Sequence, residues 1–545
     1  MKSKNTYILS GNIIDLRGNE IFKGTVYVEN GSIDRIVKEN VAEDQYILPG
    51  LIDSHIHIES SMLIPSEFAK LAVVHGTVAT VSDPHEIANV LGIDGVKYMI
   101  ENGNKVPFKF YFGASACVPA TPFETSGFQF QEKEMEELLG MKEIKYLSEM
   151  MNFPGVINQD PWEMRKIEIA RSYGKPVDGH APGVTGDDAR KYAEAGVTTD
   201  HECFTMKEAL DKIEFGMKIQ IREGSAAKNF DALIDLMKDH EDKVLFCSDD
   251  KHPNDLVKGH INELVVRAIA KGYNPLNVLR SVILNPIDHY NLEVGTLQVG
   301  DAADMIVVDN LSDFNILQTY VDGILVAESG TSYIDSIPEE QPNNFRAKKV
   351  TADMLKVIPS GNKLKVIEAY DGQLITGCLV EDYKVEDNNV VSDVDKDILK
   401  LVVLNRYEDA KPAVAFIKNF NLESGAIASS VAHDSHNIVA VGTNDADIAI
   451  AMNLVIKEEG GISLVNDEDE KVLPLPVAGL MSTCDGYRIA TSYSILDDEV
   501  HKMGSKLRAP YMTLSFMALL VIPELKLSDK GLFDGNKFSF TDLFV

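Results

Sequence analysis

The pattern of hydrophobic and polar positions changes along the chain. Residues 6–48 contain short β-branched runs separated by Gly and Asn, which are typical of strands joined by tight turns. From residue 50 to about 290, short apolar runs alternate with amphipathic stretches of helix length. Strand-like runs return after residue 291, and residues 346–545 mix both patterns. The pattern therefore predicts a β-rich start, a long α/β region and a further α+β region.

The α/β region is predicted to be a parallel sheet covered by helices. Near-continuous apolar strands that alternate with helices indicate parallel pairing. Eight such units in about 240 residues fit a TIM-like (β/α)8 barrel. A doubly wound open sheet is the alternative, although no Gly-x-Gly-x-x-Gly motif supports a dinucleotide-binding version. The predicted strands are Leu51–His57, Thr77–Asp83, Phe108–Val118, Ile144–Met150, Pro176–Ala181, Thr198–Glu202, Lys218–Gly224 and Val244–Asp249.

Three domains are expected. Residues 1–49 and 291–335 would form one small composite β-domain, discontinuous in sequence because the barrel of residues 50–290 is inserted in it. The polar, Pro-bearing residues that follow residue 335 are a predicted linker. Residues 346–545 would form an additional C-terminal α+β domain.

Composition narrows the functional classes. The formal net charge of −32 argues against a nucleic-acid partner, whose binding depends on neutralising phosphates. Five cysteines without a Cys-x-x-Cys pair fit a reducing cytoplasm, and no signal-peptide pattern or bilayer-length apolar run is expected. We therefore expect a cytoplasmic enzyme or binding protein that acts on a small molecule, forms a homo-oligomer and has no membrane partner.

The first barrel strand carries the clearest chemical signal. His55 and His57 are one residue apart, so their side chains leave the strand on the same face. Two imidazoles placed in this way can bind one divalent metal ion, although two solvated histidines near a strand end would give the same pattern.

Ionisable residues also end other predicted strands. Catalytic groups of a (β/α)8 barrel lie at the carboxyl ends of its strands. Each of these residues alone has an ordinary structural explanation, but a ring of buried charges needs mutual compensation, which one or two divalent ions provide. The further residues are Glu149 on the fourth strand, His180 on the fifth, His201 on the sixth and Asp249 on the eighth.

A two-metal site of this kind has a defined chemistry. Two ions roughly 3.5–4 Å apart can hold a hydroxide between them at neutral pH. Asp249 is placed to take the proton of that water and pass it to a leaving group. The predicted reaction is therefore hydrolysis at a polarised carbon.

Several segments carry a family resemblance. The chain resembles the amidohydrolase superfamily in several features. These are the Pro49–His57 segment, the later single histidines, Asp249 and the strand-like segment Gly300–Asp309. Within it, the chain resembles the bacterial adenine deaminase family over essentially its whole length. The resembling segments are Glu59–Met62, Ser82–Gly92, Glu149–Val156, Asp178–Gly183 and Ala432–Asn437.

The resemblance implies metal-dependent deamination of adenine to hypoxanthine and ammonia in purine salvage, with a metal-bridging hydroxide attacking C6. It implies a binuclear Mn²⁺ or Fe²⁺ centre. His55 and His57 would hold the first ion, His180 and His201 the second, with Glu149 bridging and Asp249 shuttling protons beside the metals. Many superfamily members have a carbamylated lysine at the bridge, and Lys145, nearer the strand start, is a weaker competitor for that role.

Several residues are candidates for contacting the purine, and the sequence does not choose among them. The candidates for substrate binding and for protonating N1 are His85, Glu86, Glu202 and Glu223, and His433 and His436 are candidates from the C-terminal region. Only the family resemblance indicates that the C-terminal region contributes to the substrate pocket. Alternatives are another amidohydrolase acting on a cyclic amide or amidine and, less favoured, a non-catalytic metal-stabilised scaffold.

Overall fold

The computed structural model describes residues 6–467 and 469–545. The predicted domain of residues 1–49 therefore includes a start, residues 1–5, that lies outside the described residues. No described helix combines the length and the apolar character needed to cross a membrane.

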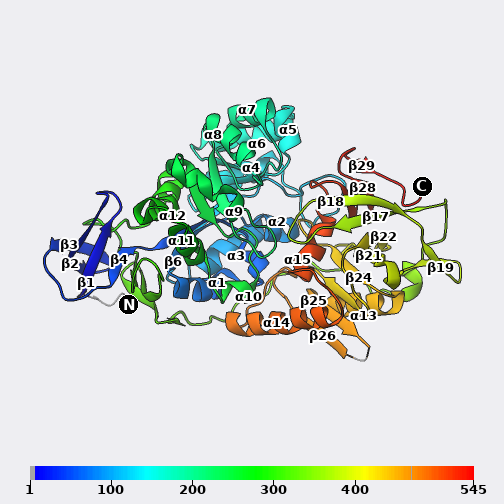
Figure 1. Ribbon diagram of the computed structural model, residues 1–545. Helices are drawn as coiled ribbons and strands as arrows, with labels where there is room; N and C mark the ends of the chain where they lie inside the picture. The colour runs from blue at the N-terminus through cyan, green and yellow to red at the C-terminus, as the bar shows by residue number, and fades with distance from the viewer. Residues whose placement is uncertain (1–5, 468) are drawn as a thin grey trace.

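Two distant segments of the chain form one eight-stranded sheet at one end of the molecule (Figure 1). β4 and β13 pair antiparallel and join the segments, with Ile47 opposite Val307. Apolar side chains such as Ile13 and Val26 fill one face of the sheet. In sheet order, the strands are β16 (Thr331–Ser332), β15 (Ile324–Glu328), β14 (Ile316–Val321), β13 (Met305–Val308), β4 (Tyr46–Pro49), β1 (Thr6–Asp15), β2 (Glu20–Glu29) and β3 (Ser32–Lys38).

All eight strands predicted between residues 50 and 290 are present, with most ends within two residues of the prediction. They form a mixed α/β fold with one five-stranded and one three-stranded parallel sheet, not one closed hydrogen-bonded barrel. Most strand residues are buried, which explains the apolar character of these runs, and the half-buried ones lie near the strand starts. They are β5 (Leu51–Ile56), β6 (Thr77–Ser82), β7 (Lys109–Ala114), β8 (Ile144–Met150) and β9 (Val177–Gly179), then β10 (Thr199–Asp200), β11 (Lys218–Arg222) and β12 (Val244–Cys247).

Two contacts connect these parallel sheets. An isolated parallel bridge joins Ile56 to Asp249, which brings the end of β12 back beside β5. On the other side, Thr198 donates a backbone hydrogen bond to Val177 at 2.8 Å. The strand arrangement therefore curves round, and its carboxyl ends face a common space.

Helices cover the outside of the parallel strands (Figure 1). Several begin at a side-chain cap; for example, the Asp160 side chain accepts from the backbone N–H of Trp162 and Glu163. The helices are α1 (Pro65–Ala72), α2 (His85–Leu91), α3 (Ile93–Gly103), α4 (Glu132–Gly140), α5 (Phe153–Ile157), α6 (Pro161–Ser172), α7 (Gly186–Ala195), α8 (Met206–Glu214), α9 (Phe230–Leu233), α10 (Pro253–Leu256), α11 (Ile261–Ala270) and α12 (Pro275–Tyr290).

The C-terminal region is built on a second eight-stranded sheet that lies against the parallel strands (Figure 1). Its order is β18 (Thr376–Glu381), β17 (Leu364–Ala369), β22 (Ala413–Lys418), β21 (Leu399–Leu404), β24 (Ile438–Gly442), β23 (Ala426–Ser429), β25 (Gly461–Asn466) and β26 (Asp469–Pro474). Two smaller sheets pair β19 (Lys384–Glu386) with β20 (Asn389–Val391), and β27 (Leu525–Ser528) with β28 (Gly531–Asp534) and β29 (Ser539–Phe540). The helices are α13 (Asp445–Lys457), α14 (Gly486–Lys502) and α15 (Pro510–Ser515).

Candidate metal centre and active site

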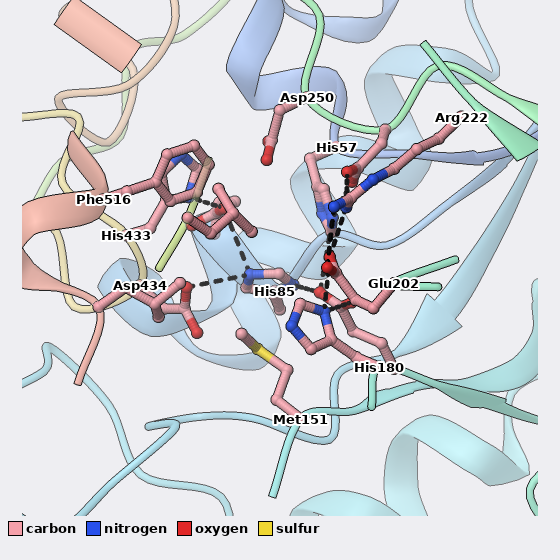
Figure 2. A pocket seen from close by; sticks show the side chains of 15 residues that line it. His57, His85, Met151, His180, Glu202, Arg222, Asp250, His433, Asp434 and Phe516 are labelled. Carbon is pink, nitrogen blue, oxygen red and sulfur yellow. Dashed lines mark hydrogen bonds and ion pairs between the residues drawn. The ribbon is translucent and has the colours of Figure 1, made fainter. Parts of the chain in front are cut away.

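The carboxyl ends of the parallel strands surround a small buried cavity (Figure 2). Residues from both the parallel strands and the C-terminal region line it, so neither region encloses it alone. The lining residues are His57, His85, Glu86, Glu149, Met151, His180, Glu202, Arg222, Asp249, Asp250, Leu374, His433, Asp434, Phe516 and Leu519.

The two histidines of the first strand meet as their spacing predicts. His55 is the last residue but one of β5, and His57 follows the strand directly. Their Nε2 atoms lie 3.2 Å apart, and Oδ1 of Asp249 lies 3.5 Å from the first and 3.4 Å from the second. Three buried lone-pair donors converge here, an arrangement that a cation stabilises and that fits a divalent metal ion.

Backbone geometry and a buried hydrogen-bond network hold Asp249 in this position. Asp249 has a positive φ of 56°, a conformation that Asp tolerates better than most residues. Its N–H donates to the carbonyl oxygen of His55 at 2.9 Å. Below it, Asp53 accepts from the N–H of Ser248 at 3.0 Å, and Nε2 of His260 lies 2.8 Å from its other oxygen. These bonds tie the ends of β5 and β12 together.

Glu149 lies between the histidines of different strands. Its Oε1 is 3.5 Å from Nε2 of His57, and its Oε2 is 2.8 Å from Nδ1 of His180 and 3.1 Å from Nε2 of His201. Burial alone would raise the pKa of Glu149, but the charges and hydrogen bonds of His180 and His201 outweigh it and hold the pKa well below its usual value. The two oxygens of this carboxylate therefore face histidines of different strands.

Lys145 lies away from this cluster. It is on the same strand as Glu149 but nearer its start, where its Nζ is 3.6 Å from Oε1 of Glu293. The position of the side chain leaves Glu149 as the bridging candidate on this strand.

Arg222 is a buried cation that is not among the candidate residues at the predicted strand ends. Its Nη1 donates to Oδ2 of Asp249 at 2.5 Å, and its Nη2 donates to Oε2 of Glu202 at 2.8 Å. Burial raises the pKa of Asp249, but the charge of Arg222 and the hydrogen bonds of His55 and His57 together outweigh this and hold the pKa well below its usual value. The alternation of Gln220 and Arg222 on β11 could have identified Arg222. Side chains two residues apart on a strand share a face, and both of these polar side chains lie on the inner face.

Glu223 points elsewhere. It follows Arg222 in sequence and so leaves the strand on the opposite side, where Oε2 lies 2.6 Å from Nη1 of Arg267. It is not among the residues that line the cavity.

The C-terminal region reaches the cavity through the loop between β23 and β24. Nδ1 of His433 and Nε2 of His436 each contact a different oxygen of Glu86. His433 also stacks on Phe516, with ring centroids 4.6 Å apart, and both side chains line the cavity (Figure 2). His436 is buried but is not among the residues that line the cavity. No sequence pattern pointed to Phe516, Leu374 or Leu519, which are apolar residues on segments far from the strand ends.

Comparisons with known proteins cover nearly the whole chain. Residues 46–326 match the model of the amidohydrolase family, and residues 373–539 match the adenine deaminase C-terminal domain. The chain is similar to curated adenine deaminases from Sulfurovum sp. (strain NBC37-1) at 56% identity and from Salinibacter ruber at 52%. These alignments cover 98% and 99% of this chain, and 99% of each relative. An adenine deaminase from Methanosarcina mazei is 51% identical over 98% of this chain and 99% of its own length.

Proposed function

The chain belongs to the adenine deaminase family of amidohydrolases, and we propose that the cavity at its strand ends holds two divalent metal ions and binds adenine for hydrolysis to hypoxanthine and ammonia. The activity follows from identity above 50% over the full length of curated adenine deaminases. The observation that supports the site is the convergence of Nε2 of His55, Nε2 of His57 and Oδ1 of Asp249 within 3.5 Å of one another.

The proposed ligands divide into two sets. His55, His57 and Asp249 would hold one ion, His180 and His201 the other, and Glu149 would contribute one oxygen to each. Support for this division is the placement of Oε1 toward His57 and of Oε2 toward His180 and His201. We propose Mn²⁺ or Fe²⁺, since imidazole and carboxylate ligands suit both ions. When bound, such a pair supplies Lewis-acid activation of water for attack on C6.

Asp249 is the proposed proton shuttle. Its Oδ2 is engaged by Arg222, so only Oδ1 faces the histidines and the cavity. The ionised carboxylate would take the proton from the attacking water and return one to the departing 6-amino group. Arg222 would keep Asp249 ionised and oriented during this transfer.

The adenine ring would lie against Glu86, Glu202 and His433, which line the same cavity. Glu202 is held by Arg222, and Glu86 is held by His433 and His436, so neither carboxylate is free to turn away. Phe516 and Leu519 supply the apolar surface that a purine ring needs for burial.

We also propose that residues 50–290 form a (β/α)8 barrel in which the hydrogen bonding between the two parallel sheets is irregular. The Ile56–Asp249 bridge and the Thr198–Val177 hydrogen bond support closure on both sides. Residues 1–49 and 291–335 would form the small β-domain and residues 346–545 the C-terminal domain.

Ammonia release tests this function. Purified enzyme loaded with Mn²⁺ or Fe²⁺ is incubated with adenine and, separately, with cytosine, guanine, hydantoin and dihydroorotate. We expect release from adenine alone, and metal analysis should find at least two ions per chain in the active protein. Release from a different compound but not from adenine would contradict the proposal.

A further inference from the structure

A second group of metal-ligand side chains lies on the side of the cavity away from Arg222 (Figure 2). It consists of His85 at the start of α2, Cys117 in the loop after β7, and Asp434 in the loop between β23 and β24. One ligand atom from each residue lies within 4.8 Å of the others, and all three residues are buried. None of the three belongs to the ligand sets proposed above.

His85 is oriented as a metal ligand would be. Its Nδ1 donates to Oδ2 of Asp83 at 3.1 Å, which fixes the ring and leaves the lone pair on Nε2. A ligating histidine commonly donates its other nitrogen to a carboxylate in this way. Glu149 also faces the Nδ1 side, at 3.5 Å, so Nε2 points away from the two-metal cluster.

Two polar atoms of this group are buried without a hydrogen-bond partner among the described residues. They are Nε2 of His85 and Oδ2 of Asp434. Nε2 lies 3.6 Å from Oδ1 of Asp434 and 3.3 Å from Oε1 of Glu86, an oxygen that His433 already engages. Most buried polar atoms have partners, so two unpartnered atoms in one group of close ligand-type side chains point to a bound ligand there.

We propose that His85, Cys117 and Asp434 bind a further divalent metal ion, Zn²⁺ by the chemistry of its donors. A thiolate, an imidazole nitrogen and a carboxylate oxygen are the three ligand types that Zn²⁺ takes in proteins. Ligand atoms around a tetrahedral Zn²⁺ stand about 3.3–3.8 Å apart, and the 3.6 Å separation of His85 and Asp434 fits this spacing.

The position of the group predicts how this ion would act. His85 and Asp434 line the cavity and Cys117 does not, so the fourth coordination position faces the cavity. A three-ligand site with an open position is the arrangement of a metal that contacts substrate. The ion also joins the parallel-strand region, through His85 and Cys117, to the C-terminal region, through Asp434. With the ion bound, His85 faces the metal and not the purine.

Metal counting on the full-length protein tests this site. Protein equilibrated with Zn²⁺ and desalted is analysed for metal per chain. We expect three ions in the unmodified protein, and two in Cys117→Ser and in Asp434→Asn. Cys203→Ser is the matched control, because Cys203 is also buried but lies beside Asp200 on another strand. This control should keep three ions.

A Co²⁺ spectrum gives a second measurement that does not depend on activity. A thiolate ligand gives Co²⁺ an intense near-ultraviolet charge-transfer band. We expect the band in the unmodified protein and in Cys203→Ser, and its loss in Cys117→Ser. If Cys117→Ser fails to fold, the Co²⁺ spectrum of the unmodified protein and the metal count of Asp434→Asn still decide the question.

Two results would overturn the proposal. One is a folded Cys117→Ser protein with the metal count of the unmodified chain. The other is an unmodified protein that shows no thiolate band with Co²⁺. His55→Asn separates failure of the proposed two-metal site from failure of the site at Cys117. This variant should lower the metal count but keep the thiolate band.

Discussion

Arg222 donates a hydrogen bond from Nη1 to Oδ2 of Asp249 at 2.5 Å, and both side chains are buried. The same guanidinium holds Glu202, so one cation stands between two carboxylates of the cavity wall. The pair explains how a carboxylate among histidines stays ionised and points one defined oxygen toward the metal ligands.

Replacing Arg222 with Met is expected to lower kcat about 100-fold, because Asp249 would lose the partner that fixes its orientation. The variant should also melt at a lower temperature, since two buried carboxylates lose their counter-charge. Arg222→Lys keeps the charge and should recover part of the activity. Steady-state kinetics with adenine and a thermal melt measure these effects, and an unchanged kcat in Arg222→Met would contradict the positioning role.

Asp249→Asn is expected to abolish turnover while the metal content stays intact. His55, His57 and Glu149 remain to hold the first ion, but the amide cannot accept the proton of the attacking water. Ammonia release and metal analysis on the same preparation check both halves of this expectation. Turnover near that of the unmodified enzyme would show that another group moves the proton.

Glu149→Gln is expected to weaken metal binding by at least about 100-fold, because a neutral amide cannot serve two cations as a carboxylate does. Lys145→Gln is the matched control on the same strand and should bind metal normally, since Lys145 lies near Glu293. Chelator competition measures the affinities. Equal affinities in the two variants would remove Glu149 from the bridge.

A chain that ends at residue 345 is expected to be inactive on adenine. It lacks Leu374, His433, Asp434, Phe516 and Leu519, which line the cavity, and it opens the site to water. Activity and solubility are measured beside the full chain. A soluble, fully active truncated protein would exclude a catalytic role for the C-terminal region.

Lys526 provides a test by pH. Burial lowers its pKa from 10.5 to about 7, and its Nζ donates to the backbone oxygens of Leu374 and Phe516 at 2.7 and 3.0 Å. The unfolded chain binds this proton more tightly than the folded chain, so the lysine destabilises the fold at and below pH 7. The penalty is relieved as the pH rises from about 7 to about 10.5.

We therefore expect the free energy of unfolding of the unmodified protein, relative to Lys526→Met, to rise with pH by up to about 1.4 kcal/mol per unit in that window. Denaturant unfolding at several pH values measures the difference. A difference that falls with pH would show that the folded state prefers the charged lysine.

Local pattern determined much of the fold. The strands from β5 to β12 were predicted because a strand buried on both faces must be apolar along its length. The eight strands do not form one continuous ladder, because the register between them depends on contacts that a single strand does not encode.

The spacing of His55 and His57, and the acids and histidines at later strand ends, selected six residues whose side chains lie together, but not Arg222 or the apolar residues of the cavity wall. Strand alternation also separates Arg222 from Glu223, but the direction in which each side chain points was known only once the inner face of β11 was known. The sequence alone does not distinguish an arginine that lines the cavity from one that forms an ion pair elsewhere, because burial is set by neighbours from other strands.

The sequence by itself determined the class of chemistry, since ligand types and strand-end spacing are local properties of the chain. Only the tertiary structure decided how the cavity is closed. His433 lies 347 residues from Glu86 in sequence and contacts it directly, and Phe516 and Leu374 reach the same cavity from other segments. Contacts between such distant segments are set by the packing of the two regions as a whole, and no periodicity within either segment encodes them.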